Sequence, residues 1–221
     1  VSDETRARVQ RIAKAFADAG AEVNFDARPD FSAEHSHATY QTLLQAAMAA
    51  RLPEHIFIGL TERATKIGDD ESASANLLRN QTARHRRWLA ANEARTHLRW
   101  AWHRFFEDWD VLLTPMMSTP AFKHDQGAFK ERSIRVDGAD RPYFEQVFWA
   151  GLTGVSLLPS TVVPTGLTDA RSTNAGSTGP GLPIGVQIVG PEYGDLDTIA
   201  AARFLETAGV CAFEPPAAYA D

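Results

Sequence analysis

The chain has 221 residues, of which 44% are hydrophobic and 23% are charged, a balance typical of folded globular proteins. Its formal net charge of −6 argues against a general nucleic-acid binder, because such proteins are normally basic. The single cysteine, Cys211, excludes an internal disulfide, and its small or apolar neighbours favour a place in the core. No apolar run is long enough to span a bilayer and no basic-then-apolar signal segment opens the chain, so we expect a cytoplasmic protein without membrane contact.

Helical periodicity dominates the first 109 residues. Ser2 and the residues after it are typical of a helix N-terminus, and that helix is expected to end at Gly20. Residues 22–25 are predicted to form a short strand, which would complete a helix–strand step of an α/β fold. A second helix is expected to open at residues 30–32 and to run to about Ala50. Its apolar face comprises Tyr40, Leu43, Leu44 and Met48.

The longest helical pattern extends from about Leu77 to Trp109, after a turn or two of helix at 52–60 and a polar loop at 66–74. The expected core stripe of this helix is Trp88, Ala91, Leu98, Trp102, Phe105 and Trp109. The arginines on its remaining surface are compatible with nucleic-acid binding. The negative charge of the whole chain favours the other interpretation, a solvated helix face.

The remaining residues, 110–221, are predicted to be richer in strands. Val111–Leu113 is expected to be a short buried strand, and residues 121–140 a polar surface excursion. A further helix should start at residues 141–143. Its inward-facing residues are expected to be Phe144, Val147, Phe148 and Gly151.

The strongest strand signal is the apolar run from Gly181 to Pro191. Its β-branched residues favour an extended backbone, and its scarcity of polar side chains predicts a strand buried on both faces, with Ile188 fully buried. A second strand, Leu157–Val163, is expected to lie beside it, because a loop rich in Gly, Ser, Thr and Asn joins the two. A helix at about 195–208 would pack across both strands.

Three separated blocks carry a resemblance to a known family. They are Asp110–Pro115 followed by Pro120–Phe122, then Pro159–Gly166, and finally Gly181–Pro191 with the acidic, Leu/Ala-rich helix after it. In this order the blocks resemble the C-terminal end of the amidase signature family, over about the last half of the chain. Gly151 and Ser160 depart from a common family form, which has Asn and Ala there. The Gly/Tyr/Ser-rich signatures that the tRNA-amidotransferase A subunit carries before the long helix are not seen here. The resemblance is therefore to the broader amidases that act on small or on aryl and alkyl amides.

That family cleaves amides with a Ser–Ser–Lys triad, which lies upstream of the matched blocks. A catalytic lysine must be kept neutral by burial or by cationic neighbours, and no lysine of this chain has such a setting. The lysines are Lys14, Lys66, Lys123 and Lys130. The Gly/Ser-rich stretch Asn174–Gly181, which includes Ser177, is expected to be an inert loop between the paired strands. We therefore assign no catalytic residue to this chain.

No metal or cofactor is expected. His35 and His37 are two residues apart in a helix and point to different sides of it, so a solvated helix start is the favoured interpretation. No Gly-x-Ser-x-Gly elbow, phosphate-binding loop or dinucleotide fingerprint occurs. The resemblance likewise implies amide hydrolysis without a metal or an organic cofactor.

We expect an α/β fold with a mixed central sheet covered by helices (α/β/α), incomplete in this chain. Residues 1–221 would be the C-terminal portion of a single amidase-signature domain, with a mainly helical part (1–109) and a strand-rich part (110–221) that ends in a helix. The parent enzyme would hydrolyse a small-molecule carboxylic amide to an acid and an amine. Its expected partners are the N-terminal half of the same enzyme and, where that half is missing, further copies of the chain.

One wall of the acyl pocket is expected at the helix that precedes the matched strand. The wall comprises Val147, Phe148, Trp149, Leu152 and Thr153. The alternative for these residues is a place in the ordinary core. The alternative for the whole chain is a non-catalytic binding or assembly module that retains part of the amidase fold.

Overall fold

A computed structural model describes residues 1–168 and 181–213 of the chain. The stretch around Ser177 and the side chain of Lys130 lie outside the described residues. The helices are α1 (Asp3–Asp18), α2 (Ala33–Ala49), α3 (Glu54–Ala64), α4 (Ala73–Gln81), α5 (His85–Asp108), α6 (Val147–Gly154) and α7 (Asp195–Thr207), with short 3₁₀ turns at Phe129–Glu131 and Tyr143–Gln146. The strands are β1 (Leu112–Pro115), β2 (Ser133–Val136), β3 (Ala139–Pro142), β4 (Ser160–Leu167) and β5 (Pro183–Val189).

The predicted apolar strand is the middle strand of a three-stranded sheet with the order β1-β5-β4. Ile188 and Val189 are fully buried, which confirms the prediction for the centre of the sheet. Both strand pairs in this sheet are antiparallel, so the expected mixed sheet is wrong for the described residues.

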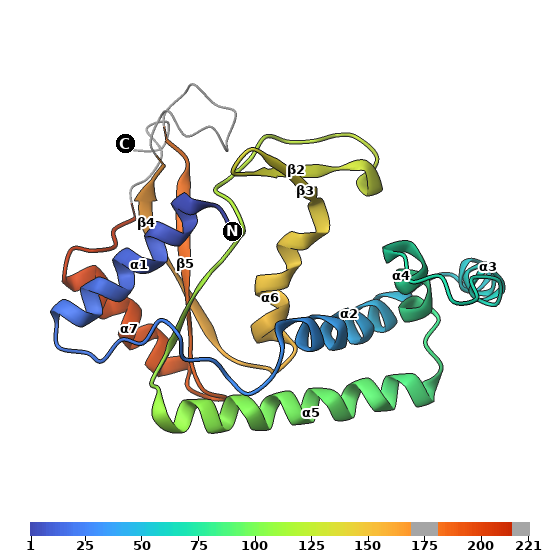
Figure 1. Cartoon of the computed structure of the whole chain (residues 1–221), viewed down its shortest axis with the longest axis horizontal. Coiled ribbons are helices and arrows are strands. Elements are labelled where there is room, and N and C mark those ends of the chain that lie inside the picture. The colour runs from blue at the N-terminus through green and yellow to red at the C-terminus, as the bar shows by residue number, and fades with distance from the viewer. Residues whose placement is uncertain (169–180, 214–221) are drawn as a thin grey trace.

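Two helices cover one face of the sheet (Figure 1). α1 contributes Ile12 and α7 contributes Leu205 to a core that also contains Val163, Val186 and Ile188 of the strands. The rings of Phe16 and Phe204 stack with their centroids 5.3 Å apart and so join the two helices above the sheet. Cys211 is buried in the same core, as expected from its neighbours in the sequence. Burial raises the pKa of its thiol, as expected for a structural cysteine.

Two predicted elements are wrong. Residues 22–25 form no strand, and Phe25 is 58% exposed, so this segment is an irregular connection along the surface. The single helix expected from Leu77 to Trp109 is two helices, α4 and α5, separated at residues 82–84. The Oδ1 atom of buried Asn80 accepts hydrogen bonds from Thr42 and Arg87, and these fix the turn so that both helices pack on α2.

The buried face of α2 is polar rather than apolar. It comprises Ser36, Thr39, Thr42, Gln45 and Ala49. Thr39 donates a hydrogen bond to the backbone carbonyl four residues earlier, which satisfies its hydroxyl group inside the helix packing. The Thr42 hydroxyl has both the Ala38 carbonyl and Asn80 Oδ1 within hydrogen-bond distance, and its single hydrogen is shared between these two acceptors. Met48, which we expected on the inward face, is 58% exposed. The apolar side of α2 is only partly covered.

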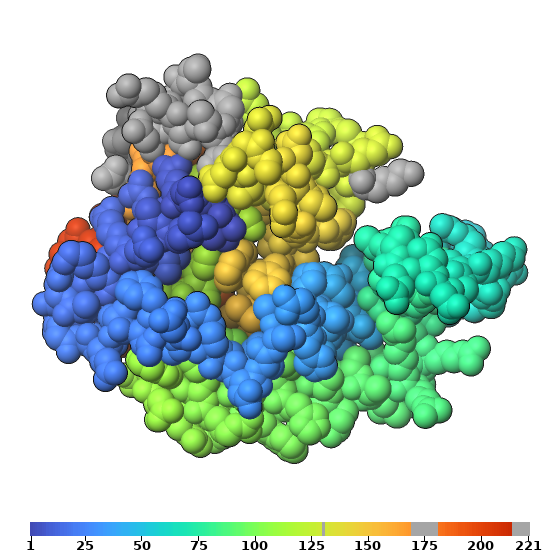
Figure 2. Space-filling model, viewed as in Figure 1, coloured from blue at the N-terminus to red at the C-terminus, as the bar shows by residue number. Residues whose placement is uncertain are grey.

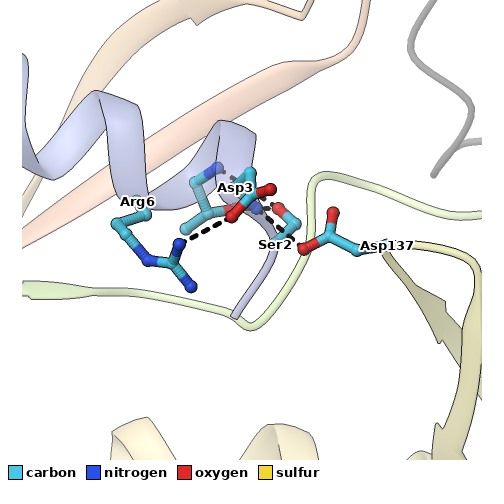
Figure 3. Close-up of polar contacts among 5 residues, drawn as sticks. Ser2, Asp3, Arg6 and Asp137 are labelled. Atoms are coloured by element: carbon cyan, nitrogen blue, oxygen red, sulfur yellow. Dashed lines mark hydrogen bonds and ion pairs between the residues drawn. The ribbon is translucent and has the colours of Figure 1, made fainter.

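The polar excursion predicted at 121–140 contains a hairpin, β2–β3, whose turn is Asp137-Gly138 with positive φ at both residues. An Asp-Gly pair in this position is a strong hairpin signal that our sequence interpretation did not use. Figure 3 shows the tip of this hairpin against the start of α1. The carboxylate of Asp137 accepts the backbone N–H of Asp3 at 2.9 Å, and Ser2 caps the same helix by accepting the N–H of Thr5.

Within residues 1–168 and 181–213, no helix is both long enough and apolar enough to cross a membrane.

Candidate functional site around α6

The five residues of the expected wall lie on α6, which follows the 3₁₀ turn Tyr143–Gln146 directly. Val147, Phe148, Trp149 and Leu152 are half-buried, and Thr153 is buried. The ring centroids of Phe148 and Trp149 lie 5.0 Å apart and the two rings are perpendicular. Phe144, which we also expected to face inward, is 46% exposed and packs instead on Phe129, at 4.7 Å between ring centroids.

A close approach between α2 and α6 sets the position of this group. Gly151 is buried on α6, and a Cβ atom at that position would lie only 2.4–2.8 Å from three ring atoms of Tyr40 on α2. Glycine is therefore required for the ring of Tyr40 to rest on the backbone of α6. Gly154, three residues later in the same helix, has no atom within 4 Å of the equivalent point. The contact is thus specific to one side of α6.

The structure adds a residue that our sequence interpretation missed. We expected His35 and His37 to form a solvated helix start; His35 is exposed, but His37 is half-buried and its ring lies 5.6 Å from that of Phe148. Burial lowers the pKa of His37 below 6.5. The imidazole is accordingly neutral near pH 7, and it offers one N–H donor and one nitrogen acceptor beside the expected wall.

Six buried side-chain polar atoms have no hydrogen-bond partner among the described residues, and three of them adjoin α6: Nδ1 of His37, Nε2 of Gln146 and Oγ of Ser156. The other three are Oγ of Ser36 on α2, and Nε of Arg99 and Nε1 of Trp102 on α5. Gln146 immediately precedes α6, Ser156 follows it closely, and His37 contacts it. A buried polar group left unpaired costs about 1–3 kcal/mol, so three of them around one short helix form an incomplete polar environment.

The lysines whose side chains the structure describes do not have the buried setting that a catalytic lysine needs. The side chains of Lys14, Lys66 and Lys123 are exposed, as expected, and Lys14 forms an ion pair with Asp18 on the surface of α1. No group of three or more His, Cys, Asp or Glu side chains in the described part of the chain could hold a metal ion. The chemistry available at α6 is therefore that of an apolar and aromatic contact surface with a neutral histidine at its side.

Comparison with known proteins identifies the family. The family model for amidases matches residues 1–199, and this chain therefore belongs to the amidase family. Residues within it are 34% identical to the indoleacetamide hydrolase of Bradyrhizobium diazoefficiens over 132 residues, which is 57% of this chain and 21% of the relative. They are 31% identical to a glutamyl-tRNA(Gln) amidotransferase subunit from Geobacter metallireducens over 123 residues, 55% of this chain and 21% of that protein.

Solved structures share the fold at low sequence identity. A bacterial aryl acylamidase of the amidase signature family matches 94% of this chain with a TM-score of 0.63 and 22% identity, but only 41% of its own length is covered. An amidase structure matches with a TM-score of 0.64 at 20% identity, with 42% of its length covered. The chain thus spans about two fifths of these structures, and the regions aligned with the curated relatives are about a fifth of theirs.

Proposed function

We propose that this chain is the C-terminal part of an amidase that hydrolyses a small carboxylic amide to an acid and an amine. The family membership of residues 1–199 supports the reaction class. The observation that carries the assignment of α6 is the set of unpaired buried polar atoms around it, beside the half-buried rings of Phe148 and Trp149. The aromatic rings suit contact with an acyl group. The unpaired polar atoms suit hydrogen bonds with polar groups that the described residues do not supply.

In this proposal the catalytic serines and lysine lie upstream of the chain. The family resemblance implies that a serine Oγ attacks the amide carbonyl carbon while its proton passes through a second serine to the lysine. The C–N bond then breaks, the amine leaves with that proton, and water hydrolyses the acyl-enzyme. The expected wall orients the acyl group, and it comprises Val147, Phe148, Trp149, Leu152 and Thr153. Neutral His37 lies beside this wall, because its ring packs against the ring of Phe148.

Reconstitution tests this proposal. We expect the 221-residue chain alone to release no amine from primary or aryl amides above the buffer rate. Co-expression with the upstream part encoded in the same reading frame should give turnover. In the reconstituted enzyme, Phe148→Ala should lower kcat/KM about 10-fold or more, because an apolar contact to the acyl group is lost. Trp100→Ala removes an aromatic side chain that is 55% exposed on α5 and serves as the control.

Two results would contradict the proposal. Turnover by the chain alone that disappears in Ser177→Ala would place the nucleophile in the stretch that we interpret as inert. An upstream reading frame without a Gly/Ser-rich segment and a lysine would favour the non-catalytic binding or assembly module. The melting temperature of Phe148→Ala serves as a folding control. If it equals that of the unchanged protein, the lower kcat/KM reflects a lost substrate contact and not a loss of folding.

A further inference from the structure

The two outer strands of the sheet differ at their backbone edges. β1 and β4 each have one neighbouring strand, β5, in the described sheet. Every second residue of such an outer strand directs its N–H and C=O groups away from the neighbour, where a further strand can bond to them. Proteins close such edges with a proline, a β-bulge or charged side chains. These features therefore decide at which edge another strand can join the sheet.

The edge of β4 is closed at the end of the strand by all three features. Pro164 has no N–H to donate, and the register of pairing with β5 shifts between Pro164 and Leu167. Within this bulge the carbonyl of Thr165 accepts hydrogen bonds from Nη1 of Arg8 at 3.0 Å and from Nη1 of Arg11 at 3.3 Å. Nη2 of Arg8 donates to the carbonyl of Leu167 at 2.6 Å. Two arginines of α1 thus occupy acceptors that an added strand would otherwise use.

The edge of β1 is open by the same criteria. Its one proline, Pro115, is its last residue, and its pairing with β5 runs without a bulge. No hydrogen bond found among the described residues joins an arginine or lysine side chain to its carbonyls. Val111 and Leu113 pack on the sheet core but are only half-buried, whereas Val163 and Thr165 of β4 are buried. The core is therefore incomplete at the strand whose edge is open.

An exposed apolar side chain on β4 does not indicate strand addition there. Val162 is 48% exposed, and it lies on the face opposite Val163, because successive side chains of a strand alternate between the two faces. Val163 belongs to the core under α1 and α7, so Val162 is on the face that these helices do not cover. A layer packed on that face would bury Val162, whereas a strand paired at the edge would leave most of it exposed.

The open edge is also the one that leads to α6. The sheet order places β1 on the side of β5 away from β4, and Figure 1 shows α6 on that side of β5. Beyond β1, the N–H of Ser118 donates to Oε1 of Gln146, the residue before α6, at 3.1 Å, and its carbonyl accepts the N–H of Ser2 at 2.7 Å. Figure 2 shows part of α6 at the surface between α1, α2 and the hairpin β2–β3. Because neighbouring strands lie about 5 Å apart, a strand added to β1 would be close to α6.

We propose that the edge of β1 binds an extended segment of the upstream part of the enzyme, and that Arg8 and Arg11 keep β4 closed to it. This inference rests on the proposed function, which puts the catalytic serines and lysine in that upstream part. Main-chain hydrogen bonds to β1 provide the attachment, and the added strand covers Val111 and Leu113. The same contact brings the upstream part beside α6, where Nε2 of Gln146 has no partner among the described residues.

Hydrogen exchange followed by mass spectrometry tests which edge is used. The 221-residue chain alone is compared with its complex with the upstream part encoded in the same reading frame. Amides in residues 111–115 should exchange about 10-fold or more slowly in the complex, because they gain hydrogen-bond partners, and those in residues 160–163 should change little. Protection at 160–163 as strong as at 111–115, or no protection at 111–115, would overturn the proposal.

Two variants separate the edges by their affinity for the upstream part. Val111→Glu places a carboxylate where the added strand would cover it, and should raise the Kd about 10-fold or more. Ile199→Glu, at an exposed position on α7, is the matched control and should bind like the unchanged chain. Arg8→Met with Arg11→Met frees the carbonyls of β4 and should also leave the Kd unchanged. Tighter binding by this double variant would place the joining edge at β4. The melting temperature of each variant alone shows whether it is folded.

Turnover is recorded separately, so that this inference and the proposed function can fail independently. A complex that is protected at β1 but hydrolyses no amide would support the assignment of the edge and contradict the proposed function. An active complex that is protected at β4 and not at β1 would do the reverse. An upstream part that does not bind the chain would overturn both.

Discussion

The sheet end of this molecule and its helices α2 and α3 are built on different principles. In the sheet, β-branched and aliphatic side chains fill a core in which Val186, Ile188 and Leu205 have no exposed surface. At the other end, α2 buries hydroxyl and amide groups, while Met48 of α2 and Ile56 and Ile58 of α3 are exposed. The comparison teaches that apolar content in a sequence marks a core only where the chain itself supplies both sides. Ile56 and Ile58 are apolar, yet the described part of the chain leaves them exposed.

The largest effect is expected from a charge in the sheet core. Ile188→Asp would place a carboxylate in a fully apolar setting, and we expect the free energy of unfolding to fall by about 3 kcal/mol or more. Urea titration followed by circular dichroism measures this loss. Ile199→Asp, at a position on α7 that is 52% exposed, should cost far less. Equal losses at the two positions would mean that the sheet end is no more tightly packed than the surface.

A smaller effect is expected where α2 meets α6. Gly151→Ala should reduce the free energy of unfolding by about 1–3 kcal/mol, because the new methyl group would overlap the ring of Tyr40. Gly154→Ala, in the same helix with open space around it, should instead raise stability by up to about 1 kcal/mol. Opposite signs at the two glycines would identify the ring contact as the cause. In a Tyr40→Ala background the cost at Gly151 should disappear.

The sequence was informative where one local signal decides the outcome. The apolar run at 181–191 predicted the central strand, and the capping residues Ser2 and Ser32 marked the starts of α1 and α2. The break between α4 and α5 could not be predicted, because it depends on Asn80 bonding to Thr42, 38 residues away. The hairpin at Asp137-Gly138 could have been predicted, since the turn signal is local.

The candidate site was predictable only in part. The pattern before the matched strand located α6, but a sequence does not report which polar atoms remain unpaired after folding. Gly151 was expected to face inward. Its contact with the Tyr40 ring could not be predicted, because that contact depends on how α2 packs against α6. His37 was assigned with His35 to a solvated helix start, because two histidines that are two residues apart point to different sides of a helix. Tertiary contact with Phe148 placed the two histidines in different environments.

The smallest expected effect is a pH dependence at His37. Its pKa in the folded state is lowered from 6.5 by burial, whereas in the unfolded chain it returns to the ordinary value. Well above pH 6.5 the histidine is neutral in both states, so it adds no pH dependence there. As the pH falls below 6.5 the unfolded state binds the proton first, and the free energy of unfolding decreases until the folded-state pKa is passed.

We therefore expect the unchanged chain to lose more stability than His37→Gln as the pH is lowered from about 7.5 to about 5. Urea titrations at each pH measure the difference, and His35→Gln, at the exposed neighbour, should follow the unchanged chain. The loss should be modest, because the His37 ring is only half-buried and water screens part of its charge. A difference between the unchanged chain and His37→Gln that does not vary with pH would show that the ring is hydrated. That result would contradict the assignment of His37 as a neutral side chain beside Phe148. The proposed acyl wall would then lose one of its polar neighbours.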